Sequence, residues 1–234
     1  MPELMAYHWR HNPRARQLQV RITPWQGIEV VIPPHTSKQR VSSFLAKHRH
    51  WIHDTWVRMQ SQIADAGLTL PVALDLCAIG EYWQVHYRRR PGACARADVG
   101  VHAITIYHAG DDESACRAAL RRWLACHARE HLGAKARRMS AVTGFSYRRL
   151  QIRGQKSRWG SCSSSGTLSL NYKLLFLEPE LVRYLLIHEL SHTRILDHSP
   201  RFWELVARHE PRWRLLDEEL GEAWRDIPAW VEMP

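Results

Sequence analysis

A short string near the C-terminal end of the chain has the residue types and spacing for metal-dependent hydrolysis. In His188-Glu189-Leu190-Ser191-His192, two histidines stand four residues apart and a glutamate follows the first. On an α-helix the two imidazoles lie one turn apart on the same face, so both can bind one ion, and Glu189 lies about 100° round the helix beside that ion. Zinc lowers the pKa of a bound water to about 7, and a nearby carboxylate can take the proton and return it to a leaving amine. The string therefore indicates zinc-dependent hydrolysis.

The surrounding residues predict that this string lies on a buried helix. Glu178-Pro179-Glu180 is typical of a helix start, because proline suits the first helical position and acidic residues suit the first turn. The run from Leu181 to Ile195 contains no helix breaker, and apolar residues cover most of its circumference. Polar groups buried on such a helix need partners, and a metal ion is a natural partner for two histidines.

A third ligand is expected shortly after the second histidine. His198 follows His192 by six residues, and the chain between them can end the helix and turn back before Ser199-Pro200 begins another. We therefore predict one Zn²⁺ ion with three histidine ligands and a glutamate as general base: His188, His192, His198 and Glu189.

Two nearby acidic residues leave alternatives open. Glu204 on the next predicted helix could replace His198 as the third ligand, as in the thermolysin-like arrangement. Asp197 could orient a ligating imidazole through a hydrogen bond, or it could cap a helix end.

The stretch 152–206 resembles the YgjP-type metallopeptidase family (DUF45, M48-like). The resemblance rests on an RWGSC string, a predicted strand, the HELSH string and an HSPRFW string, in that order. It implies a zincin-like fold and a zinc site made by the residues named above. It implies much less about the substrate, because a family defines a chemistry and not a target.

A strand is predicted at 167–175, after a Ser-Ser-Ser-Gly turn. In zincins such a strand borders the cleft, and a polypeptide substrate can add to its free edge through main-chain hydrogen bonds. The alternative is a core strand with Leu168, Leu170 and Tyr172 packed inward.

The residues beside this strand complete the predicted site. Arg158, Asn171 and Tyr172 are predicted to bind substrate, and Arg158 is left open between this role and support of its loop. Trp159 and Gly160 are expected to be structural.

A second string in the sequence also has metal-ligand spacing. His127-Ala128-Arg129-Glu130-His131 matches the inverted motif HxxEH. The helix that contains it is rich in arginine and lysine and has a single apolar stripe, which is typical of an amphipathic helix with a solvated basic face. We therefore interpret these histidines as surface residues and expect no metal there.

The order of predicted elements indicates an α+β fold with a zincin-like core and an N-terminal β-hairpin and helix layer. Two parts are predicted, a β-rich N-terminal layer with one helix at 1–110 and a zincin-like catalytic region at 111–234, packed as one unit. The predicted elements are a hairpin at 16–32, a helix at 37–64, a strand pair at 80–90 and 99–109, and a helix at 113–141.

Composition limits the protein class. The 234 residues are 45% hydrophobic, and no apolar run reaches the length of about 18 residues that a membrane helix needs. The N-terminus lacks the apolar segment of a secretion signal, and the five cysteines form no CxxC pair. These features favour a cytoplasmic protein that does not interact with membranes.

The net charge of +10 favours weak electrostatic association with nucleic acid, although no nucleic-acid-binding module is visible. Three functions are therefore considered: a zinc metallopeptidase acting on polypeptides, a nucleic-acid-associated zincin acting on DNA-bound proteins, and a non-catalytic zinc-stabilised binding module. The first is preferred, because a purely structural zinc site has no need of Glu189 as a base.

Overall fold

The computed structural model describes residues 7–13, 15, 17–23, 27–65, 70–92, 95–110 and 112–233. The chain divides into two compact units, one made of residues 1–69 with 232–234 and the other of residues 70–231. The division falls between residues 69 and 70, before the four-stranded sheet, and not near residue 110.

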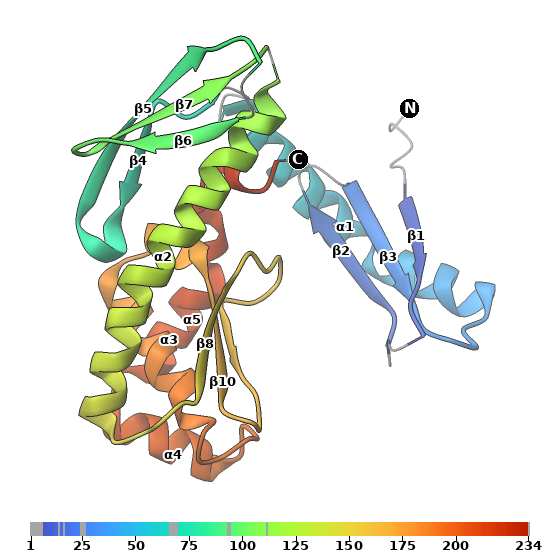
Figure 1. Ribbon diagram of the computed structural model, residues 1–234. Coiled ribbons are helices and arrows are strands. Elements are labelled where there is room, and N and C mark those ends of the chain that lie inside the picture. The colour runs from blue at the N-terminus through green and yellow to red at the C-terminus, as the bar shows by residue number, and fades with distance from the viewer. Residues whose placement is uncertain are drawn as a thin grey trace. The chain divides into compact units, whose positions relative to one another are not determined.

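The N-terminal unit is a three-stranded sheet followed by a long helix (Figure 1). Its elements are β1 (Tyr7–His11), β2 (Gln19–Thr23), β3 (Gly27–Ile32) and α1 (Lys38–Asp65). The strand order is β1-β3-β2, with β2 and β3 antiparallel, which confirms the predicted hairpin; its turn at 24–26 lies outside the described residues. Val30 and Ile32 of the sheet are buried with Val41 of α1.

The second unit begins with a four-stranded sheet. Its elements are β4 (Ala73–Leu76), the 3-10 turn η1 (Cys77–Ile79), β5 (Glu81–Arg89), β6 (Arg96–Val99) and β7 (Ala103–His108). The strand order is β4-β5-β7-β6. The two predicted strands, β5 and β7, do pair, but they are parallel because β6 lies between them along the chain. Alternate residues such as Val85, Ile104 and Ile106 are buried, as expected for a sheet with one covered face.

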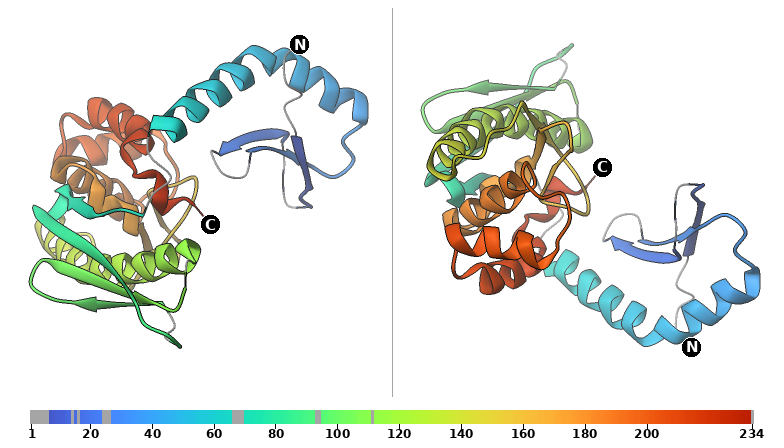
Figure 2. Two further views of the ribbon diagram at one scale, coloured as in Figure 1. Left: turned by 90° about the horizontal axis from the view of Figure 1, so that it is seen from above. Right: turned by 90° about the horizontal axis from the view of Figure 1, so that it is seen from below.

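Helix α2 (Glu113–Thr143) covers that sheet and joins it to the rest of the unit. The Asp112 side chain accepts a hydrogen bond from the Ala115 backbone at its start, and Gly144 ends it with a left-handed φ of 71°. Leu120, Leu124 and Leu132 are fully buried, and their spacing of four or eight residues keeps them on one face. Figure 2 shows α2 between the sheet and the C-terminal helices.

The other sheet of this unit has three strands and lies beside the C-terminal helices. It contains β8 (Arg149–Arg153), β9 (Gly160–Cys162) and β10 (Thr167–Asn171), followed by the 3-10 turn η2 (Tyr172–Phe176). The predicted strand at 167–175 therefore ends at residue 171. Strand β10 is central, pairing with β8 on one side and β9 on the other, so the prediction that β10 has a free edge for substrate is wrong. Leu168 and Leu170 are fully buried, as the core-strand alternative requires.

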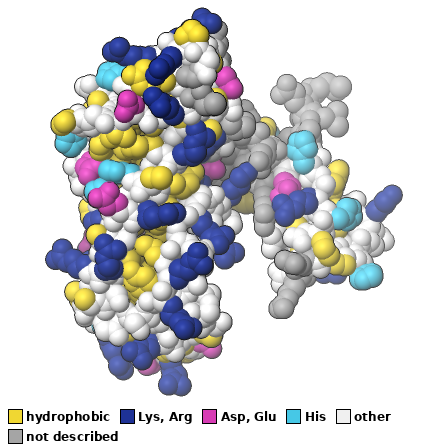
Figure 3. Space-filling view, in the orientation of Figure 1, with side chains coloured by type: hydrophobic (Ala, Val, Ile, Leu, Met, Phe, Trp, Pro, Cys, Tyr) yellow, Lys and Arg dark blue, Asp and Glu magenta, His cyan; other side chains and the backbone are white. Residues whose placement is uncertain are grey.

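The remaining elements are helices. They are α3 (Pro179–Ser191), α4 (Pro200–His209), α5 (Trp213–Glu222) and the 3-10 turns η3 (Ala223–Asp226) and η4 (Ala229–Val231). Both predicted helix starts are confirmed, with Pro179 and Pro200 at the beginning of α3 and α4. None of the helices in the described part of the chain has an apolar stretch that could cross a membrane. Lys and Arg side chains are spread over the visible face of this unit (Figure 3).

Candidate metal centre and active site

Helix α3 and the turn after it bring the predicted ligands together. The helix ends at Ser191, four residues earlier than its apolar pattern predicts, and His192 is its C-cap residue. Backbone hydrogen bonds from Thr193 to Leu190 and from Ile195 to Ser191 form a tight turn. The chain then returns along α3 and places His198 beside His188.

The three histidines form one cluster. One nitrogen from each of His188, His192 and His198 lies within 4.8 Å of the others. The Nε2 atoms of His188 and His198 are 3.1 Å apart, and Phe202 stacks on the His192 ring with centroids 4.4 Å apart. Glu204, the alternative third ligand, is exposed on α4 and is not among the described residues that form this cluster.

Hydrogen bonds at the far side of two rings orient them. The Nδ1 atom of His192 lies 3.0 Å from the carbonyl oxygen of Ile195, to which it can donate. The Nδ1 atom of His188 lies 3.4 Å from the hydroxyl oxygen of Tyr184, and that hydroxyl donates to Asp217 at 2.7 Å. Donation through Nδ1 leaves Nε2 of each ring with a free lone pair, which is the form that binds metal.

Sequence analysis missed Tyr184 and Asp217. Tyr184 precedes His188 by one helical turn, and this spacing is the one signal that could have indicated a contact. Asp217 comes from α5, and nothing local in the sequence connects it to the site. Asp197 accepts a hydrogen bond from the backbone of Ser199, the residue that precedes α4, so its side chain is engaged beside this helix start.

Burial favours the neutral form of the His188 and His192 imidazoles. The pKa of His188 is lowered to about 3, first because burial penalises the charged ring and then because His192 and His198 are close. Burial also lowers the pKa of His192. Neutral imidazoles with converging nitrogens are ligands that suit zinc, so the residues present fit this ion.

Glu189 lies on the same helix, buried against β9. Burial raises its pKa to about 8, although the charge of Arg158 and a hydrogen bond from the Cys162 backbone act in the opposite direction. Its side chain fills the space over Gly160, where an added Cβ would lie 2.8 Å from the Glu189 Cγ. A buried carboxyl group whose pKa is near neutrality is a typical general base.

Comparison with protein families matches residues 16–223 to the YgjP-like metallopeptidase domain. The chain belongs to the YgjP-like family. The family resemblance predicted from the sequence is thus confirmed, and with it the α+β fold and the metallopeptidase class.

Two archaeal metallopeptidase zymogens are similar to parts of this YgjP-like chain. Abylysin of Pyrococcus abyssi is 27% identical, with 39% of this chain and 92% of that chain covered and a TM-score of 0.36. Jannalysin of Methanocaldococcus jannaschii is 18% identical, with 40% of this chain and 96% of that chain covered and a TM-score of 0.36. None of the curated proteins compared with the chain matches it.

The loop before β9 positions Arg158 in this YgjP-like site. Asn171 is fully buried, and its side-chain amide donates to the carbonyl oxygens of Gln155 at 2.8 Å and Arg158 at 3.0 Å. Lys173 also donates to the Gln155 carbonyl. The indole of Trp159 donates to the Leu220 carbonyl at 2.9 Å. This hydrogen bond supports the expected structural role of Trp159. The Arg158 side chain is exposed, and its charge acts on Glu189.

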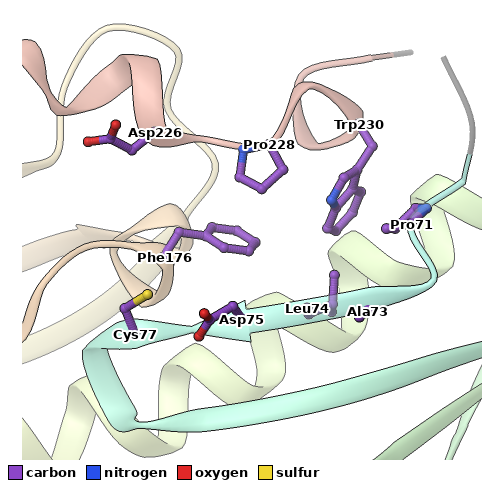
Figure 4. Close-up of a pocket in the computed structure, with 9 residues that line it drawn as sticks. All are labelled: Pro71, Ala73, Leu74, Asp75, Cys77, Phe176, Asp226, Pro228 and Trp230. Carbon is purple, nitrogen blue, oxygen red and sulfur yellow. The ribbon is translucent and has the colours of Figure 1, made fainter. Parts of the chain in front are cut away.

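The two other predicted substrate residues are mostly enclosed. Asn171 is fully buried and Tyr172 is 9% exposed, packed against Gly154. Both support the loop or the core, and their contact with substrate stays a prediction. A separate cavity of about 270 Å³, shown in Figure 4, lies between Leu74, Phe176 and Trp230, and none of the predicted site residues lines it.

Proposed function

We propose that this YgjP-like metallopeptidase is a zinc-dependent peptidase that cleaves polypeptides with Glu189 as its general base. The observation that carries the proposal is the convergence of three imidazole nitrogens within 4.8 Å, at the C-terminal end of the helix that also bears a buried glutamate. A non-catalytic zinc module would have no use for such a base, and this argues against that alternative.

His188, His192 and His198 would hold the ion, with His188 and His192 oriented by Tyr184 and the Ile195 carbonyl. When bound, zinc would act as a Lewis acid and lower the pKa of a water molecule. Glu189 would take a proton from the attacking water and deliver it to the leaving nitrogen of the cleaved peptide bond. Its raised pKa suits both transfers, because a carboxylate of ordinary pKa holds a proton too weakly at neutral pH.

A polypeptide substrate suits the surroundings of Glu189. Within the described part of the chain, strand β9 pairs only with β10 and is therefore an edge strand, in contact with α3. Apart from the Cys162 N–H, which donates to Glu189, the main-chain groups along this edge can bind an extended peptide beside the base. Arg158, which is exposed and whose charge acts on Glu189, can bind a substrate carbonyl or carboxylate group.

We also propose that the protein works in the cytoplasm. Cys77, Cys116, Cys126 and Cys162 are all free thiols, which suits a reducing compartment.

Zinc content and casein hydrolysis test the proposal together. Untagged protein should lose hydrolysis after chelation and regain it with zinc. His198→Ala should lose activity and the ion bound by the three histidines, whereas Glu204→Ala should keep both, because Glu204 is exposed outside the cluster. Zinc lost from Glu204→Ala and retained by His198→Ala would overturn the ligand set. Chelation that leaves activity unchanged would overturn the metal mechanism.

A further inference from the structure

A second group of metal-ligating side chains lies on the other part of this unit, where sequence analysis expected a solvated surface. His127 and His131 of α2 meet Glu81 of β5, and one ligand atom from each lies within 4.8 Å of the others. The Nε2 atom of His127 is 2.7 Å from one Glu81 oxygen, and the Nε2 atom of His131 is 3.7 Å from the other. The interpretation of these histidines as surface residues is wrong, because their side chains are 13% and 29% exposed.

The glutamate in the cluster is not the one in the sequence motif. Glu130, the acidic residue of HxxEH, is exposed on α2 and is not a member of the cluster. Glu81 lies 46 residues before His127 and reaches it because α2 packs across the sheet. The spacing of the two histidines thus brings both to one carboxylate, but this carboxylate belongs to Glu81 and not to the motif.

Aromatic neighbours hold the three side chains in place. The indole of Trp83 donates to Oε2 of Glu81 at 2.8 Å, the same oxygen that His127 approaches, and this hydrogen bond helps to fix the carboxylate. Trp123 stacks on the His127 ring at 4.8 Å between centroids and 16° between planes, and Trp83 contacts the same ring edge-on. Side chains held in this way lose little conformational freedom when they bind an ion.

We propose that Glu81, His127 and His131 form a second divalent-cation site, of the zinc class, that links β5 to α2. Two imidazoles and one carboxylate are a donor set that zinc commonly takes, and the two Nε2 atoms face the same carboxylate from adjacent helical turns. A simple ion pair would need only one of the two histidines. Three protein ligands leave one position for water, and the partial exposure of the side chains gives solvent access to it.

The proposal does not depend on the catalytic assignment, because the two clusters share no residue. The proposed ion would connect β5 with α2, which are distant in sequence. Binding to the folded chain alone would raise its stability, and this effect can be measured without any enzyme assay.

Zinc stoichiometry of the untagged full chain tests the proposal. Protein stripped with chelator, reloaded with zinc and freed of excess metal should contain two ions per chain. The count should fall to one in Glu81→Gln and in His127→Ala/His131→Ala, and also to one in His188→Ala/His192→Ala. Glu130→Gln should keep both ions, as should His50→Ala/His53→Ala, which removes two exposed histidines elsewhere.

A stability measurement keeps the test valid if a variant folds poorly. In the His188→Ala/His192→Ala background, zinc should still raise the melting temperature, and adding the conservative Glu81→Gln change should remove most of that rise. One ion in the wild type and none in His188→Ala/His192→Ala would overturn the second site while leaving the first intact. Two ions in wild type and in Glu81→Gln and His127→Ala/His131→Ala alike would also overturn it. Zinc retained in full by His188→Ala/His192→Ala would instead contradict the catalytic site.

Discussion

Glu189 lies directly over the backbone of Gly160, so closely that a Cβ at residue 160 would be 2.8 Å from its Cγ. Gly160→Ala must therefore displace either the base or strand β9. We expect a loss of about 1–3 kcal/mol in the free energy of unfolding, as for other overpacked sites. Casein hydrolysis should fall by about 10²-fold, because small displacements of catalytic groups have effects of this size. Urea unfolding and casein assays measure the two effects.

Gly221→Ala is the matched control for this change. Gly221 lies in α5, has no atom within 4 Å of an added Cβ and does not have a left-handed φ. The substitution should raise stability by about 0.5–1 kcal/mol and leave hydrolysis unchanged. Equal activity in both variants would show that contact with Gly160 does not position the base.

Tyr184→Phe removes the hydroxyl group that connects His188 to Asp217. The zinc affinity of the three-histidine site should fall by about 10- to 100-fold, as when other hydrogen bonds to ligating histidines are removed. Tyr87→Phe is the control, because the Tyr87 hydroxyl donates to the Pro71 carbonyl and is not connected to the histidines. Competition with a zinc chelator measures both affinities. A similar loss in the two variants would mean that general destabilisation, and not orientation of His188, is responsible.

Arg158 should affect the pH at which the enzyme becomes active. Glu189 must be ionised to accept a proton, and the positive charge of Arg158 lowers the pKa of Glu189. Arg158→Gln should therefore move the acid limb of the kcat/KM profile to higher pH, and high salt should reduce the difference. Arg158→Lys keeps the charge, so the acid limb of its profile should lie closer to that of the wild type. Superimposed profiles for wild type and Arg158→Gln would remove Arg158 from this role.

In chelator-treated protein, the raised pKa of Glu189 should appear as a pH dependence of stability. Between the ordinary value of about 4.5 and the folded value of about 8, the folded chain holds a proton that the unfolded chain has lost. The free energy of unfolding should therefore decrease as pH rises through this window, by at most ~1.4 kcal/mol per pH unit. Glu189→Gln cannot ionise and should lack this decrease.

Urea unfolding of wild type and Glu189→Gln at pH 6.5 and 8 makes the comparison. His188, whose pKa is about 3 when folded and 6.5 in the unfolded reference, is half protonated in the unfolded state at pH 6.5, but this contribution is common to both proteins and cancels from the comparison. The free energy of unfolding of Glu189→Gln should increase relative to that of the wild type as pH rises. Parallel changes in the two proteins would show that Glu189 does not hold its proton in the folded state.

Local sequence patterns were sufficient for the part of the site that lies on one continuous segment. Pro179, Pro200 and the spacing of His188, His192 and His198 are properties of neighbouring residues, so helix geometry predicts where they lie. The YgjP-like strings around them identified the family.

Contacts between distant segments could not be predicted in this way. Asp217 reaches Tyr184 from α5, and Glu81 reaches His127 from β5, because of how helices and strands pack. The central place of β10 also depends on strand order, which the alternation of its residues does not determine. Sequence spacing indicates which face a residue occupies, but not which other segment covers that face.

Glu189→Gln gives the most direct test of the proposed mechanism. Glutamine has nearly the same shape and Glu189 is not a proposed ligand, so zinc content and fold should be retained. The variant cannot accept a proton from water, so casein turnover should fall by about 10²–10⁴-fold, toward the upper end because both proton transfers depend on one residue. Turnover and zinc are measured in the same preparations, with chelated wild type as the blank. Activity equal to wild type and clearly above that blank would contradict the assignment of Glu189 as the base.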